Sequence, residues 1–336
     1  MSYKRILFTS PGIAELCDYE PAPLQPGQAM VQLSRSTISS GTERANLVGD
    51  PNTSYNRPGR VRFPRSAGYS SSGVIVEVAP DVTDLQVGDR VALSWSSHSQ
   101  LCPMDQYNLI KIGDTPFDEA ALWHIATFPT AAIRKCRLEL GESAIVMGQG
   151  VLGMMAVQLL RAAGAAPIIA VDPVAAKREQ ALKIGADYAL DPFAEDFVQT
   201  AKELTGGGAN VAIEVTGNGK ALDQVLDCMA RFGRVALLGC TRNSDFTIDY
   251  YRKVHGPGIT MIGAHTDARP RKESHPGYWT TRDDMLAIQR LYAMGRLSFA
   301  QLLQEVHSPE ECPEVFARLA AENHFPLVQF DWEMRK

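Results

Sequence analysis

The sequence predicts an α/β protein with two parts, a β-rich part and a doubly wound parallel sheet. The first 123 residues contain short strand-forming runs between turn residues, and residues 124–264 alternate apolar runs with helical stretches. The chain has 336 residues, which is long enough for two domains and a substantial core. These observations define the expected architecture.

The first part is expected to be mostly β-structure. Residues 29–33, 72–78 and 90–93 read as strands, each bounded by Gly, Pro or Asp. The stretch 50–64 is rich in proline and arginine and is predicted to be an exposed loop.

The second part is expected to form six parallel strands. The candidates are 144–147, 168–171, 187–190, 211–215, 234–238 and 259–263. Helical stretches separate most of these strands, which predicts a doubly wound sheet of the Rossmann type. Two helices, near 282–294 and 309–321, and an apolar run at 325–330 are expected to return to the first part. The predicted domains are therefore 1–123 with 265–336, and 124–264.

A glycine-rich turn follows the first of these strands and opens a helix. It consists of Gly148, Gln149, Gly150, Val151, Leu152 and Gly153. Gly148 permits the tight turn, Gly150 lets the backbone approach a pyrophosphate, and Gly153 lets the helix pack closely on the strand. The helix N-terminus offers N–H groups and a favourable dipole to the anion. The alternative is a glycine-rich turn in an unrelated α/β domain.

Asp172 ends the second strand of this part, 19 residues after Gly153. A carboxylate there accepts hydrogen bonds from ribose hydroxyls and repels a 2′-phosphate, which predicts NAD as cofactor. Lys177 and Arg178 come one helical turn later and either lie beside the adenine, reach a phosphate, or are solvated on a helix face. Further contacts are expected from the ends of neighbouring strands, at Val215, Thr216, Leu238 and Gly239.

Composition excludes several classes of protein. The net charge of −5 gives no general attraction to nucleic acid or anionic membranes. No apolar run approaches the roughly 20 residues that span a bilayer. The six cysteines are scattered without a Cys-x-x-Cys pair, which argues against a zinc ribbon. We expect a cytoplasmic protein with a small-molecule substrate and no nucleic-acid or membrane partner.

Several motifs together resemble the medium-chain dehydrogenase/reductase superfamily, the relatives of zinc alcohol and polyol dehydrogenases. They are 73–78 (Gly-Val-Ile-Val-Glu-Val), 87–91 (Val-Gly-Asp-Arg-Val), the turn at Gly148, and 233–235 (Gly-Arg-Val). The resemblance covers nearly the whole chain. It implies a GroES-like β-barrel catalytic domain beside a Rossmann domain, a cleft between them, and a homodimer or homotetramer.

The departures from the zinc pattern are informative. Where zinc members have a cysteine ligand this chain has Ser40, where they have a Gly-His-Glu motif it has Tyr69 in place of histidine, and the third ligand position holds His124. The structural-zinc lobe has no counterpart. One imidazole cannot hold zinc without partners, although His98 could add a second, so no metal is expected. Residues 39–44 resemble a zinc-free subgroup that includes bacteriochlorophyllide-dehydrogenase-like and sugar-linked enzymes.

Without zinc, side chains must move the proton. By the resemblance, Thr42 matches the hydroxyl that touches the substrate oxygen, and Tyr69 and His124 lie beside the reacting carbon as candidate acids and bases. Ser40 and Glu43 complete the predicted catalytic set. For His124 the alternative is a core histidine, and for Tyr69 it is packing with Glu43.

Substrate contacts are expected from His98 and from the loop 263–280, where His265 and Trp279 are the candidates. The alternatives are a structural His98 and a solvated loop with one aromatic anchor.

The function that these features predict is a zinc-independent NAD(H)-dependent oxidoreductase. It would interconvert a secondary alcohol and a ketone on a polar, sugar- or polyol-like substrate. The alternatives are a reductase of an activated C=C bond and a non-catalytic NAD-binding protein.

Overall fold

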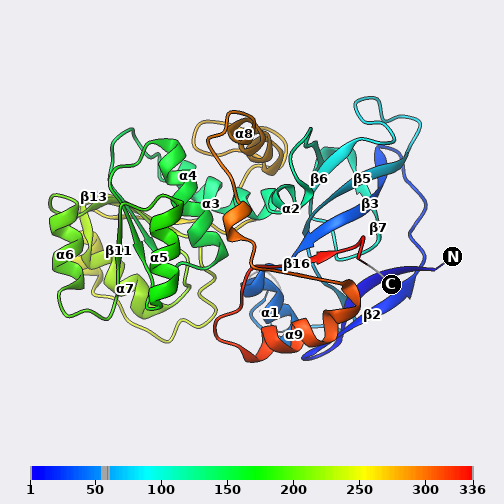
Figure 1. Ribbon diagram of the computed structural model, residues 1–336. Helices are drawn as coiled ribbons and strands as arrows, with labels where there is room; N and C mark the ends of the chain where they lie inside the picture. The colour runs from blue at the N-terminus through cyan, green and yellow to red at the C-terminus, as the bar shows by residue number, and fades with distance from the viewer. Residues whose placement is uncertain (1, 54–58, 60, 335–336) are drawn as a thin grey trace. The chain divides into compact units, whose positions relative to one another are not determined.

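The computed structural model describes residues 2–53, 59 and 61–334, and the chain divides into two compact units. The first unit comprises Met1–Ile125 and Ser298–Lys336, and the second comprises Ala126–Leu297 (Figure 1). The second unit is thus inserted into the first, as the sequence indicated. Part of the loop predicted at 50–64 lies outside the described residues.

The first unit is built mainly from antiparallel strands. One sheet has the order β2-β1-β4, and the other has the order β15-β16-β3-β5-β6-β8, with β7 also paired to β3. The strands are β1 (Tyr3–Ser10), β2 (Ile13–Tyr19), β3 (Gln28–Thr37), β4 (Arg65–Ser66), β5 (Ser70–Val78), β6 (Arg90–Ser94), β7 (Leu101–Asp105), β8 (Leu109–Lys111), β15 (Glu305–His307) and β16 (Val328–Asp331). Its helices are α1 (Ser40–Val48), α2 (Phe117–Ala120) and α9 (Cys312–Ala321), and α3 (Trp123–Lys135) runs on into the second unit.

Strand β3 is the centre of the larger sheet and pairs with β5, β7 and β16. The pairing with β5 is very close, since a Cβ added to Gly73 would lie 2.2 Å from the carbonyl oxygen of Gln32. Only glycine fits there, which accounts for the glycine that opens the 73–78 motif. Behind the sheet, Phe8, Phe316 and Phe330 belong to one buried apolar cluster.

The second unit contains a six-stranded, all-parallel sheet with the order β11-β10-β9-β12-β13-β14. The strands are β9 (Ala144–Met147), β10 (Ile168–Val171), β11 (Tyr188–Leu190), β12 (Ala209–Glu214), β13 (Met229–Leu237) and β14 (Thr260–Gly263). Its remaining helices are α4 (Val151–Ala163), α5 (Ala175–Ile184), α6 (Phe197–Leu204), α7 (Gly219–Asp227) and α8 (Thr281–Ala293). This strand order is the doubly wound order, and it reverses between β9 and β12. All six predicted strands are present, and β9 and β10 have the predicted bounds.

The boundary between the units differs from the sequence-based one. Residues 265–297 were expected in the first domain, but they belong to the second unit. Asp284 of α8 is fully buried there and receives a hydrogen bond of 2.7 Å from Arg134 of α3, with Arg269 at 3.6 Å. Arg269 also donates to the carbonyl oxygen of Thr127 at 3.0 Å. These polar contacts attach the loop and α8 to α3.

None of the helices in the described ranges is long and apolar enough to cross a membrane.

Candidate functional site

The glycine-rich turn has the shape that a pyrophosphate site requires. Gly148 adopts φ +99°, which permits the turn out of β9. A Cβ on Gly153 would lie 1.9 Å from the carbonyl oxygen of Gly148, so only glycine allows α4 to pack this closely. Gly150 caps α4 without a side-chain hydrogen bond, and a Cβ there would meet no atom within 4 Å. The first-turn N–H groups, with Val151 and Leu152 partly exposed, are therefore available to an anion.

Asp172 joins this turn to the next strand. One carboxylate oxygen accepts the backbone N–H of Gln149 at 2.8 Å, and the other accepts that of Val174 at 2.9 Å. The side chain of Gln149 points inward and donates to the carbonyl oxygen of Val146 at 3.0 Å. The Asp172 carboxylate is thus fixed at the carboxyl end of β10, where the ribose-binding acid of a Rossmann site is found.

The two basic residues after Asp172 have different surroundings: Lys177 lies near the Asp172 carboxylate, and Arg178 is hydrogen-bonded to the backbone and to Asp191. The Lys177 ammonium lies 4.0 Å from an Asp172 carboxylate oxygen. Arg178 donates to the carbonyl oxygens of Asp172 and Pro173 at 2.7 and 2.9 Å, and to Asp191 at 3.2 Å. Lys177 therefore stays a candidate contact, whereas the guanidinium of Arg178 holds the turn.

The ends of β12 and β13 also meet, at the predicted residues. A Cβ on Gly239 would lie 2.7 Å from the carbonyl oxygen of Val215, and 2.3 Å from the N–H nitrogen of Gly217. Leu238, which precedes this glycine, is buried. The two strand ends are thus in contact at the carboxyl edge of the sheet.

Glu214, at the end of β12, was missed by the sequence analysis. Its buried carboxylate accepts the backbone N–H and the hydroxyl of Thr216, and the N–H of Gly217 at 3.2 Å. Burial raises the pKa of this carboxyl, although the hydrogen bonds oppose the shift. An acid at the end of an otherwise buried strand was the available signal. Glu214 shapes the turn that contains Thr216.

In the first unit, two predicted catalytic residues lie together. The rings of Tyr69 and His124 are 5.7 Å apart and perpendicular. Trp95 completes the cluster, with its ring centroid 4.6 Å from that of His124 and 6.1 Å from that of Tyr69. His124 is 1% exposed, whereas Trp95 is 44% exposed. The cluster therefore places an imidazole beneath an accessible indole, with a half-buried phenol beside it.

Trp95 was missed by the sequence analysis. Its backbone has φ +61°, an uncommon conformation for a residue with a Cβ and a bulky side chain. The only signal in the sequence was an aromatic residue just after β6, at the start of the short connection to β7.

Glu43 and His98 form a separate buried pair. The Nε2 atom of His98 is 3.0 Å from a Glu43 carboxylate oxygen, and its Nδ1 is 2.8 Å from the Ser36 hydroxyl. The second Glu43 oxygen accepts the backbone N–H of Ser39 at 2.8 Å. The two side chains are 2% and 0% exposed. This geometry favours a structural role for both residues, the alternative that the sequence left open for His98, while the catalytic role of Glu43 and the substrate contact of His98 stay predictions.

The buried pair fixes the start of α1, where two other predicted residues lie. Ser40 is the first residue of this helix and Thr42 the third, and both are partly exposed. Their hydroxyl groups are therefore carried on a helix end that Glu43 holds in place.

The two candidates in the loop before α8 have different surroundings. The ring of Trp279 is stacked on the guanidinium of Arg134, with Cζ 3.5 Å from the ring centroid. One face of the indole is therefore covered, which fits the aromatic anchor that the sequence left as the alternative to substrate binding. His265 is partly exposed, and its Nδ1 accepts the N–H of Asp267 at 3.2 Å. His265 stays a candidate.

The residues at the three ligand positions do not fit zinc. They are a serine hydroxyl, a phenol and one imidazole, at Ser40, Tyr69 and His124, and catalytic zinc sites need about three strong protein ligands. Within the described ranges, no three His, Cys, Asp or Glu side chains gather in a way that could hold a metal ion. No chemical step is therefore assigned to a metal.

Comparisons with known proteins identify the family that both parts of the chain resemble. Residues 25–133 match the family model described as alcohol dehydrogenase GroES-like domain, and residues 151–274 match that described as zinc-binding dehydrogenase. The D-guloside 3-dehydrogenase of Escherichia coli (strain K12) is 26% identical over 336 residues, covering 93% of this chain and 95% of the relative. The L-threonine 3-dehydrogenase of Caldanaerobacter subterraneus subsp. tengcongensis is 30% identical over 240 residues, covering 61% of this chain and 67% of the relative.

The fold also matches solved structures. One, from Sinorhizobium meliloti 1021, is described as a zinc-binding dehydrogenase and is bound to NADP. It aligns with a TM-score of 0.82 at 20% sequence identity, and the alignment covers 98% of this chain and 99% of the solved chain.

Proposed function

Because the chain belongs to the medium-chain dehydrogenase/reductase superfamily, we propose that it is a zinc-independent, NAD(H)-dependent oxidoreductase. It interconverts a secondary alcohol and a ketone on a polar, sugar- or polyol-like substrate. The observation that carries this proposal is the cluster of His124, Tyr69 and Trp95. Its imidazole and phenol are proton-transfer groups at two positions that the family resemblance assigns to zinc ligands.

The choice of NAD rests on Asp172. Its carboxylate is fixed by two backbone N–H groups, so it cannot turn away from a 2′-phosphate without breaking them. Arg178, the nearest arginine after it, is bonded to the backbone and to Asp191. Lys177 lies 4.0 Å from the Asp172 carboxylate and offsets its charge only in part. The structural relative that holds NADP shows that the fold alone does not decide this choice.

Oxidation of an alcohol requires that the proton of the substrate hydroxyl be removed, and side chains of this protein must accept it. Bound NAD⁺ supplies the acceptor for the hydride from the alcohol carbon. In the proposal, His124 takes the hydroxyl proton as it leaves, and Tyr69 donates a hydrogen bond to the same oxygen. Thr42 adds a second hydroxyl donor, which stabilises negative charge on the oxygen in either direction of the reaction.

A sugar-like substrate fits the character of the cluster. An exposed indole offers an apolar face to ring C–H groups, while the adjacent phenol and imidazole bind hydroxyl groups. The E. coli relative is a D-guloside 3-dehydrogenase, so its name describes oxidation of a sugar derivative.

The test is turnover of NAD⁺ with a panel of glycosides and polyols, in the presence and absence of a chelator. The proposal expects NADH formation that the chelator leaves unchanged. His124→Ala should lower kcat by about 10²-fold or more, whereas NAD affinity should change little. Tyr69→Phe keeps the ring and serves as the matched variant, with a smaller loss expected. Reduction of enones but not ketones, or NAD binding without turnover of any substrate, would refute the proposal.

A further inference from the structure

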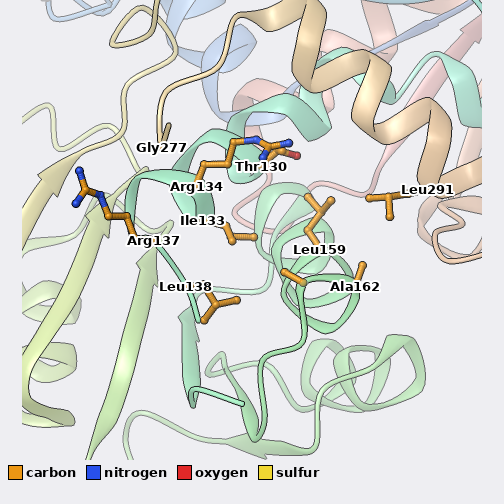
Figure 2. Close-up of a pocket in the computed structure, with 10 residues that line it drawn as sticks. Thr130, Ile133, Arg134, Arg137, Leu138, Leu159, Ala162, Gly277 and Leu291 are labelled. Atoms are coloured by element: carbon orange, nitrogen blue, oxygen red, sulfur yellow. The ribbon is translucent and has the colours of Figure 1, made fainter. Parts of the chain in front are cut away.

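A pocket of about 340 Å³ lies in the second unit, among α3, α4 and α8. Its apolar lining consists of Ile133, Leu138, Leu159, Ala162, Ala163 and Leu291. Arg134, Arg137, Thr130 and the backbone at Gly277 supply the polar part (Figure 2). The volume is within the range of about 300–1,000 Å³ that is typical of small-molecule sites.

The pocket is separate from the dinucleotide turn. Leu159, Ala162 and Ala163 lie in the last turns of α4, whereas the turn at Gly150 precedes its first residue. At 1.5 Å per residue this separation is on the order of 15 Å. The pocket therefore does not belong to the site already described.

The two arginines of the pocket differ in their surroundings. Arg134 is fixed, since its Nε donates to the buried Asp284 at 2.7 Å and its guanidinium stacks on Trp279. Arg137 is exposed, and across the described ranges its side chain takes part in no ion pair or hydrogen bond. The charge of Arg134 is thus compensated within the protein, while that of Arg137 is not.

The backbone of Arg137 adds an independent observation. It has φ +49°, in the left-handed region, where the chain leaves α3 and its N–H bonds to the carbonyl oxygen of Arg134. Glycine or asparagine is the usual residue at such a helix end. A long cationic side chain is therefore held in a strained conformation at the edge of an apolar pocket, and retained strain of this kind is often found at ligand sites.

We propose that this pocket binds a small organic carboxylate with an apolar body. The apolar part fills the space between α3, α4 and α8, and the carboxylate pairs with Arg137. A neutral apolar ligand would leave Arg137 unused, and a small inorganic anion would leave the apolar lining unfilled. An amphiphilic carboxylate satisfies both features of the pocket.

The probe for this proposal is octanoate, with octanamide as the uncharged control, titrated by calorimetry into the full chain saturated with NAD. Saturation excludes binding at the dinucleotide turn. We expect one octanoate per chain, bound about tenfold or more tightly than octanamide. Equal affinities for the two probes, or no binding of octanoate at millimolar concentration, would overturn the proposal.

Two variants at one position separate binding from folding. Arg137→Gly removes the charge and relieves the left-handed strain, so its melting temperature should equal or exceed that of the wild type while octanoate binding falls about tenfold. Arg137→Lys keeps the charge but loses the planar guanidinium, so it should bind octanoate more weakly than the wild type and more tightly than Arg137→Gly. If Arg137→Gly binds octanoate as the wild type does, the proposal is wrong.

Ala162→Phe fills the pocket from α4 and should abolish octanoate binding while NAD binding persists. Sedimentation of this variant tests the rival occupant, a second copy of the chain. If the wild type sediments as an oligomer and the Ala162→Phe variant sediments as a monomer, the pocket is part of a protein interface and the carboxylate assignment fails. If Ala162→Phe does not fold, the Arg137 pair still decides the outcome.

Discussion

Replacement of His98 by phenylalanine distinguishes a structural role of the Glu43–His98 pair from the catalytic and substrate-binding roles that the sequence suggested. Phenylalanine keeps an aromatic ring at this position but removes both ring nitrogens. The space around the ring is tight, because a Cβ on Gly68 would lie 2.7 Å from the His98 ring. The substitution leaves Glu43, 2% exposed, without the partner at 3.0 Å. Loss of one partner of a buried pair of this kind costs about 3–5 kcal/mol in the free energy of unfolding.

The expected loss is large enough to measure by calorimetry. For a unit of this size, 1 kcal/mol shifts the melting temperature by about 2–4 °C, so His98→Phe should lower it by roughly 6–20 °C. The matched variant is Glu43→Gln combined with His98→Phe. It removes the uncompensated carboxylate but keeps an oxygen for the N–H of Ser39, so it should recover a substantial part of the loss.

Activity of the folded protein is the second readout. Well below the melting temperature, His98→Phe should keep kcat within a fewfold of the wild type, since His98 only supports α1. A melting temperature unchanged within 2 °C would show that the pair contributes little to stability. A normal melting temperature with a large loss of kcat would show that His98 acts on the substrate, and the structural assignment would be refuted.

Four other results are expected. Asp172→Ser should narrow the preference for NAD over NADP, measured by calorimetry, and equal affinities in the wild type would contradict the assignment. Trp95→Ala should raise KM for sugar-like substrates more than it lowers kcat, and the reverse pattern would exclude a binding role. The purified protein should hold far less than one zinc per chain by elemental analysis. Burial lowers the pKa of His307, but hydrogen bonds with Glu305 and Glu311 outweigh this and raise it. The stabilising contribution of His307 is therefore present below about pH 6.5 and is lost as the pH rises through the higher pKa of the folded state. His307→Gln should therefore weaken the dependence of the melting temperature on pH between pH 6 and 8.

Much of the fold was predictable because its signals are local. The glycines at 148, 150 and 153 follow a buried strand of four residues, and short-range spacing alone indicates the turn. The domain boundary was not predictable in this way. It depends on Asp284 and Arg134, which are 150 residues apart in the sequence and meet only in the folded unit.

The candidate site was predictable where a motif fixes the position of a residue. His124 and Tyr69 were placed by their neighbours in the sequence, and the structure brings their rings to 5.7 Å. Trp95 has no motif of its own, and its place in the cluster depends on a backbone conformation that sequence patterns do not predict for tryptophan. The Glu43–His98 pair is likewise a contact across 55 residues, so neither side chain revealed its partner in advance.

Three residues other than glycine adopt positive φ in the described chain, namely Trp95, Arg137 and Phe232. Such conformations cost of order 1–3 kcal/mol, and glycine would avoid this cost wherever only the turn mattered. Phe232 has a local explanation, since its ring packs on Gly258 and its N–H bonds to the carbonyl oxygen of Pro257. The other two border the aromatic cluster and the pocket, where their side chains supply an exposed indole and an unpaired charge. Backbone strain and side-chain chemistry therefore point to the same two places in this chain.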